Sequence, residues 1–157
     1  MWDMSKNLGY AFDDDKYNRL VLLFEPTFAT YIDRLVQEKS ALFAGDRHFI
    51  GFYLDNELPF ASYQNADPLR GIDLKHFLSL PERYKAAREY AEKFMRDNGI
   101  ASTGVITKKN QEDFRGMVAD YYYQLTTATV RRYDKEHLIL GTRLHDWSKY
   151  NQKVVEA

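Results

Sequence analysis

The sequence predicts an α/β fold, in which helices cover parallel strands. Two short segments, 49–54 and 137–142, are almost continuously apolar, and helices with a single apolar face separate them along the chain. A strand that is apolar on both faces is typical of a parallel sheet covered on both sides. The chain of 157 residues suffices for one domain of about 150 residues and falls well short of the ~250 residues of a complete eight-stranded α/β barrel.

Charge and composition exclude several classes of function. The chain has 22 Lys and Arg against 23 Asp and Glu, a net charge of -1, and its basic residues are scattered. We therefore expect no nucleic-acid partner, because such domains need a basic face to neutralise phosphates. The absence of cysteine excludes disulfides, thiolate metal ligands and cysteine nucleophiles. No apolar run approaches the ~18 residues of a membrane span, and residues 1–10 lack a signal-peptide layout, so we expect no membrane association.

The first half of the chain is predicted to begin with an irregular lead-in over residues 1–23, with a weak strand at 20–24. A helix over 27–43 follows, because its apolar residues recur at the i, i+3, i+4 spacing of one helix face and Pro26 suits the first turn. The first firm strand is expected at 49–54, where six consecutive residues carry only apolar side chains or Gly.

Proline and glycine punctuate residues 58–81, which we interpret as a long, partly ordered active-site loop because loops of this length are usually functional. A helix is predicted over 82–97, with Gly99 just past its end. A longer helix is predicted over 111–132, with Asn110 as its N-cap.

The second firm strand, at 137–142, and the first turns of a helix at 148–157 complete the predicted order. Two parallel strands do not make a stable sheet alone. We therefore interpret residues 1–157 as a single fragment of a larger α/β fold, and the order of its elements favours a (β/α) barrel as the parent.

Asp55, Asn56 and Glu57 follow the first firm strand directly. In α/β folds the carboxyl ends of parallel strands are where ligands bind. One interpretation is structural: Asp55 and Asn56 cap the loop, as such residues do at turns, and Glu57 is exposed to water. The other is chemical, since a carboxylic acid beside an amide is what glycoside hydrolysis needs to protonate the leaving oxygen and bind the sugar 2-hydroxyl.

Three stretches carry a family resemblance: FEPTF at 24–28, FIGFYLDNELPF at 49–60, and RYDKEHLILGTRLH at 132–145. Together they resemble the central part of beta-agarase and related beta-galactosidase-like glycoside hydrolases, which are retaining enzymes on (β/α)8 TIM barrels. The resemblance implies that the two firm strands are about the fourth and fifth of the barrel. The implied substrate is a beta-galactan or agarose-type polysaccharide.

The resemblance also implies roles for individual residues. Glu57 would be the general acid/base, Asn56 would bind the 2-hydroxyl, and Arg143 and His145 would contact substrate at the end of the second strand. Independently, Trp147 lies in the loop that follows, where it suits either stacking on a sugar ring or anchoring the loop. Tyr53 is expected in the barrel wall.

The second carboxylate of a retaining pair, the nucleophile, is expected outside this chain, and the fragment alone is then expected to be inactive. The alternative function is a non-catalytic carbohydrate-binding or truncated barrel protein, assembled with the rest of the barrel or with itself, because an open half barrel exposes strand edges. The resemblance implies a secreted or periplasmic protein.

The remaining histidines and tyrosines are assigned structural roles. His48 is expected to be structural at the amino end of the first strand, His76 to be a solvated loop residue, and His137 to pack or cap. The three tyrosines at 121–123 lie on a helix and are expected to pack in different directions. The histidines and carboxylates show no metal-ligand spacing, so we expect no metal and no cofactor.

Overall fold

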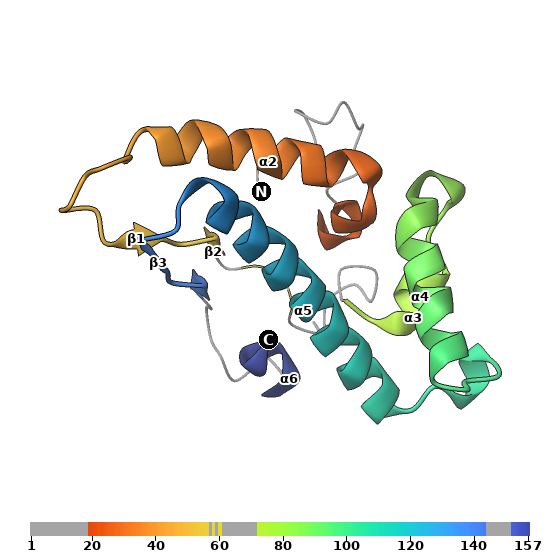
Figure 1. The fold of residues 1–157 in the computed structure, drawn as a ribbon. Coiled ribbons are helices and arrows are strands. Elements are labelled where there is room, and N and C mark those ends of the chain that lie inside the picture. Colours follow the sequence, from red (N-terminus) through yellow and green to blue (C-terminus); the bar gives the residue numbers. More distant parts are fainter. Residues whose placement is uncertain (1–18, 57, 59, 61–71, 144–151) are drawn as a thin grey trace.

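The computed structural model describes residues 19–56, 58, 60, 72–143 and 152–157 of the chain. The long helix α5 (Lys108–Tyr133) runs through the middle of the molecule, and α2 (Pro26–Ala41) packs against it. The short strands lie at one end of this pair of helices, and α4 (Lys85–Asp97) lies at the other (Figure 1). The described residues form a mostly helical α/β fold with a small parallel sheet, and they do not close a barrel.

The predicted weak strand at 20–24 is wrong, because this segment forms the 3-10 helix η1 (Arg19–Phe24). Four successive residues, Leu20 to Leu23, are all buried, so apolar contacts surround the segment on every side. The side chains of a strand point to two faces only, whereas those of a helical turn point outward in all directions around its axis. Tertiary packing here overrides the local β preference.

Helix α2 begins at Pro26, one residue before the predicted start, and ends at Ala41, before the predicted end at residue 43. Phe43 leaves the helix and stacks on Phe49, with ring centroids 4.1 Å apart and planes 10° from parallel. Such a stacked pair adds to the free energy of simple burial.

Both predicted strands form and they are parallel, although they are shorter than predicted. Strand β1 (Gly51–Phe52) pairs with β3 (Leu138–Ile139), and β2 (Asp55–Asn56) pairs with β4 (Thr142–Arg143). The amide of Leu54 donates to the carbonyl of Gly141 at 2.8 Å and so joins the two short ladders.

The prediction that both strand faces are buried is wrong for the described residues. Ile50 is 71% exposed, Tyr53 58% and Leu138 56%, so several apolar side chains of these segments are uncovered. Helices α2 and α5 cover these segments in part, and Phe52, Tyr53 and Leu54 line a small cavity together with residues of both helices.

The predicted loop at 58–81 is only partly irregular. It contains the short helix α3 (Leu74–Leu78), while residues 61–71 lie outside the described part of the chain. The 3-10 turn η3 (Glu82–Tyr84) leads into α4, which ends beside Gly99 as predicted, with Gly99 at a φ of 63°. A further 3-10 turn, η4 (Thr103–Val105), connects α4 to α5.

Helix α5 starts three residues earlier than predicted, and its N-cap is Thr107 rather than Asn110. The amide of Asn110 donates to Thr107 Oγ1 at 3.1 Å, and the amide of Thr107 donates to Asn110 Oδ1 at 2.9 Å. This reciprocal capping box satisfies two backbone donors at once, which a cap at Asn110 would not.

The end of the described chain is the short helix α6 (Gln152–Glu156), which packs on α5 through buried Val154. It lies within the helix start predicted at 148–157. In the described ranges, no helix combines the length and apolar character that crossing a membrane requires.

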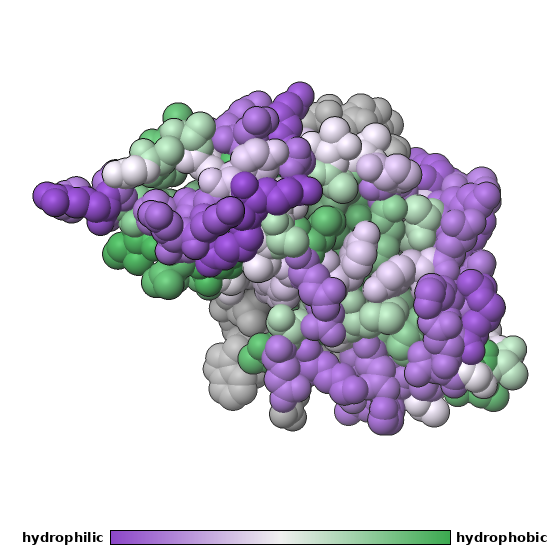
Figure 2. Space-filling model, viewed as in Figure 1, coloured by the Kyte–Doolittle hydropathy of each residue, from purple (hydrophilic) through white to green (hydrophobic). Residues whose placement is uncertain are grey.

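The core lies between η1, α3, α4 and α5. On the face shown in Figure 2, hydrophilic residues surround a central area of more apolar residues. Aromatic rings fill much of the core: Phe77 and Phe94 both meet Phe114 edge-on, with centroids 5.1 and 5.4 Å away. This aromatic core holds α5 in place, and α5 in turn supports the strand ends that carry the candidate site.

Candidate functional site

The carboxyl ends of the parallel strands bring two of the predicted site residues into register. Asn56 in β2 pairs with Arg143 in β4, and Asp55 pairs with Thr142. Glu57, His145 and Trp147 lie outside the described residues. In the chain, however, Glu57 directly follows Asn56, and His145 is two residues beyond Arg143.

Asp55 is half-buried and lies in a strand, which differs from the turn-capping role considered for it. The hydroxyl of Tyr122, on α5, is 3.4 Å from Asp55 Oδ2 and 3.4 Å from the Leu54 carbonyl oxygen. Burial of the Tyr122 ring, and then the negative charge of Asp55, raise the pKa of this phenol. The hydroxyl therefore keeps its proton at neutral pH and acts as the donor.

Arg143 and Tyr53 together form an exposed surface beside these strand ends. The guanidinium carbon of Arg143 lies 5.6 Å from the centroid of the Tyr53 ring, within the range of a cation–π contact. Tyr53 was expected in the barrel wall, but its side chain is exposed in the described structure. The Tyr53 ring can stack on a sugar, and the Arg143 guanidinium can donate hydrogen bonds to sugar hydroxyls. In the sequence, no signal distinguished Tyr53 from the aromatic residues that pack in the core.

The amino end of the strand pair holds a tight polar cluster around His137. Its ring Nδ1 lies 2.7 Å from Asp134 Oδ2, and its Nε2 lies 3.3 Å from the carbonyl oxygen of Asp46. The hydrogen bond to Asp134 raises the pKa of His137. Burial works against ionisation of Asp134, but hydrogen bonds from the His137 amide and ring outweigh it and lower the pKa of this carboxyl.

His137 therefore packs and caps as predicted, with its ring also edge-on to Phe49 at 5.1 Å. His48 is exposed at the same end of the strands. The prediction of a solvated His76 is wrong, because this residue lies in α3 and is 5% exposed. Across the described ranges no three His, Asp or Glu side chains gather as a metal site would require.

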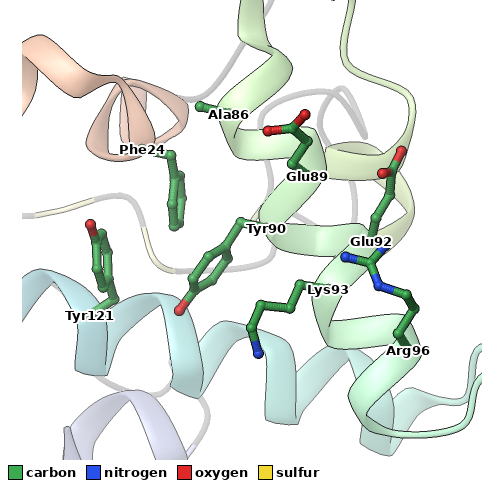
Figure 3. Close-up of a pocket in the computed structure, with 8 residues that line it drawn as sticks. All are labelled: Phe24, Ala86, Glu89, Tyr90, Glu92, Lys93, Arg96 and Tyr121. Carbon is green, nitrogen blue, oxygen red and sulfur yellow. The ribbon is translucent and has the colours of Figure 1, made fainter.

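A separate surface groove of about 630 Å³ lies between η1, α4 and α5 (Figure 3). Phe24 contacts both tyrosines of the groove, at centroid distances of 4.3 Å to Tyr90 and 5.4 Å to Tyr121. Burial raises the pKa of Tyr90 to about 12. Because these rings pack mainly against one another and tie η1 to the two helices, we assign the groove to structure.

The three consecutive tyrosines of α5 pack in different directions, as predicted. Tyr121 stacks on Phe24, Tyr122 is buried beneath the strand end, and Tyr123 lies tilted against Phe60 at 6.1 Å. The sequence pattern gave no indication that the middle ring would reach the candidate site.

Comparison with known proteins finds a similar fold. No protein-family model matches the chain, and no curated protein sequence matches it. Among solved structures, the chain is similar to the crystal structure of BpGH50, a glycoside hydrolase family 50 protein, with a TM-score of 0.78 and 25% sequence identity. The match covers 99% of this chain and 34% of BpGH50, so the chain spans about a third of that protein's length. The fold is thus similar to part of a glycoside hydrolase.

Proposed function

We propose that this chain supplies about the fourth and fifth strands of a (β/α)8 barrel in a retaining glycoside hydrolase, with Glu57 as the general acid/base. The observation that carries the proposal is the parallel register of Asn56 with Arg143, which gathers polar residues at the strand ends from which Glu57 follows. The similarity to BpGH50 along nearly the whole chain supports the same class of enzyme.

In the proposed mechanism, Glu57 donates a proton to the glycosidic oxygen while a second carboxylate attacks the anomeric carbon and forms a covalent glycosyl-enzyme. Glu57 then takes a proton from the water that releases the sugar. The second carboxylate must lie about 5 Å from the first in a retaining enzyme, and we expect it outside residues 1–157. That expectation agrees with the match to only 34% of BpGH50.

Substrate contacts follow from the same arrangement. Asn56 is proposed to bind the sugar 2-hydroxyl, and Arg143, His145 and Trp147 are proposed to hold neighbouring sugar units. The proposed substrate is a beta-galactan of the agarose type, as the sequence resemblance implies. A polymer of that size is degraded outside the cytoplasm, so we also propose a secreted or periplasmic location.

The test is Glu57→Gln in the full-length gene product, with Glu89→Gln on the surface of α4 as the matched control. We expect Glu57→Gln to lower kcat on agaro-oligosaccharides by about 10²- to 10⁴-fold, the usual contribution of general acid–base catalysis. The kcat/KM on a nitrophenyl β-galactoside should be affected much less, because it reports formation of the glycosyl-enzyme and this leaving group needs little protonation. Unchanged hydrolysis of the oligosaccharides by Glu57→Gln would refute the assignment.

A carbohydrate-binding protein without hydrolytic activity is the second candidate, and the exposed pair of Tyr53 and Arg143 favours it. A titration with agaro-oligosaccharides, run beside a reducing-sugar assay, separates the two functions. Binding without release of reducing ends supports the second candidate, and release of reducing ends supports the hydrolase.

A further inference from the structure

One buried aromatic residue of α5, Tyr122, packs beneath the end of the strand that precedes Glu57 in the chain. Tyr122 is 2% exposed, and its ring lies edge-on to Phe60 and Tyr123, with centroids 6.2 and 5.2 Å away. A ring enclosed in this way has little freedom to move. Its hydroxyl is therefore held beside the Leu54 carbonyl and the side chain of Asp55, at the start of β2.

That hydroxyl faces two acceptors at once, the Leu54 carbonyl and the Asp55 carboxylate, each 3.4 Å away. Each contact is long for an O–H···O hydrogen bond, so one proton is shared between them. A hydroxyl buried in protein needs an acceptor, and a half-buried carboxylate is stabilised by a nearby donor. The pair thus ties α5 to the last two residues before Asn56.

We infer that Tyr122 is a positioning residue for the acid/base chemistry proposed at Glu57, because its hydroxyl contacts the Leu54 carbonyl and the Asp55 carboxylate, which directly precede Asn56 and Glu57 in the chain. The inference rests on the proposed function. Tyr122 touches neither substrate nor reacting atoms in this role. It acts through Asp55, by limiting how far the following residues shift, and a misplacement of 1 Å at a catalytic group costs as much as about 100-fold in rate.

The test is Tyr122→Phe in the full-length gene product, which removes the hydroxyl and keeps the packed ring. We expect kcat on agaro-oligosaccharides to fall about tenfold, within the loss that a misplaced catalytic group produces, with KM changed by less than twofold. The loss in kcat/KM should be much smaller on a nitrophenyl β-galactoside, because kcat/KM reports formation of the glycosyl-enzyme and that leaving group departs without full protonation. Tyr90→Phe, a partly buried tyrosine of α4, is the matched control and should leave both rates unchanged.

The outcomes separate this inference from the proposed function. If Glu57→Gln leaves hydrolysis unchanged, the proposed function fails and the inference falls with it. If Glu57→Gln abolishes hydrolysis while Tyr122→Phe stays within twofold of the wild type, only the inference is overturned. Equal losses in kcat/KM on both substrates would mean that Tyr122 serves the fold alone, which also overturns it.

A second variant, at Asp55, tests the same contact without changing Tyr122, in case Tyr122→Phe does not fold. Unlike Asp55→Asn, whose amide oxygen can still accept from the Tyr122 hydroxyl, Asp55→Ala removes the carboxylate acceptor that this hydroxyl faces. We expect the same dependence on the leaving group, with a thermal unfolding midpoint close to that of the wild type. An Asp55→Ala protein that hydrolyses both substrates at wild-type rates would overturn the inference.

Discussion

The two ends of the parallel strand pair are built differently. At the amino end, His137 makes a 2.7 Å contact to Asp134, and Arg131 Nη1 donates to the His137 carbonyl at 2.8 Å. At the carboxyl end, the contacts from Tyr122 are 3.4 Å long, and Arg143 is exposed. The first end is closed by short, charge-assisted hydrogen bonds, and the second leaves polar and aromatic groups open to a ligand.

This difference agrees with the different roles that the two ends of parallel strands usually have. Groups at the amino end of such strands serve stability, whereas the loops after the carboxyl ends carry ligand binding and chemistry. Here the amino-end cluster contains no residue proposed for catalysis, and the carboxyl end contains Asn56 and Arg143. Substitutions at the two ends are therefore expected to give different kinds of defect, the first in unfolding and the second in turnover.

The largest expected effect comes from Gly51→Ala, which breaks the strand pairing itself. A Cβ at Gly51 would overlap the carbonyl oxygen of Leu138 in the neighbouring strand. Because backbone atoms have to move apart to admit it, we expect unfolding free energy to fall by about 3 kcal/mol. Chemical denaturation measures the change, with Gly104→Ala as the control, since the nearest atom to a Cβ there is 3.8 Å away. Equal unfolding midpoints for the two variants would contradict the observed pairing.

A smaller and pH-dependent effect is expected from His137→Gln. Both ring nitrogens of His137 face acceptors, the Asp134 carboxylate and the Asp46 carbonyl, so the doubly protonated imidazolium donates a hydrogen bond to each. The hydrogen bond to Asp134 raises the pKa of His137. A group whose pKa is raised on folding stabilises the protein fully below its unfolded pKa of about 6.5, and loses that contribution as pH rises through the folded value. The variant should be most destabilised near pH 5.

The groups that face His137 decide over which pH range the unfolding of His137→Gln should be measured. They are the carboxylates of Asp134 and Glu136 and the carbonyl of Asp46. Asp134 has a lowered pKa, so its own contribution is present above about pH 4 and is lost on acidification below that. Unfolding midpoints between pH 5 and 8 therefore isolate the histidine. Thr107→Ala, which removes a helix cap, should destabilise equally across this range, and a pH-independent loss in His137→Gln would argue against the imidazolium.

The smallest effect on stability is expected from Arg143→Ala at the carboxyl end. This side chain is exposed, and its described contact is the one to the exposed ring of Tyr53. Unfolding free energy should change by no more than about 0.5 kcal/mol. In the full-length gene product we expect KM for agaro-oligosaccharides to rise about tenfold, equivalent to ~1.4 kcal/mol of lost binding. A large loss of stability with an unchanged KM would reverse the comparison of the two ends.

The helices were largely predictable because their signals are local. Helices α2 and α4 follow apolar periodicities that place one face inward, and Gly99 marks the end of α4. The start of α5 was misplaced because Thr107 and Asn110 are both good capping residues, and they share the cap reciprocally. Burial of His76 was missed for a different reason, since it depends on packing between α3 and the rest of the core.

The sequence by itself determined the α/β class, the parallel strands and the placement of Asp55, Asn56 and Glu57 directly after an apolar strand, because each follows from residues that are neighbours in the chain. Only the tertiary structure decided that Asn56 pairs with Arg143 and that Tyr122, 67 residues from Asp55, supports that strand end. Such contacts depend on how α5 docks as a whole. Docking is set by the combined packing of many distant side chains, which no local pattern records.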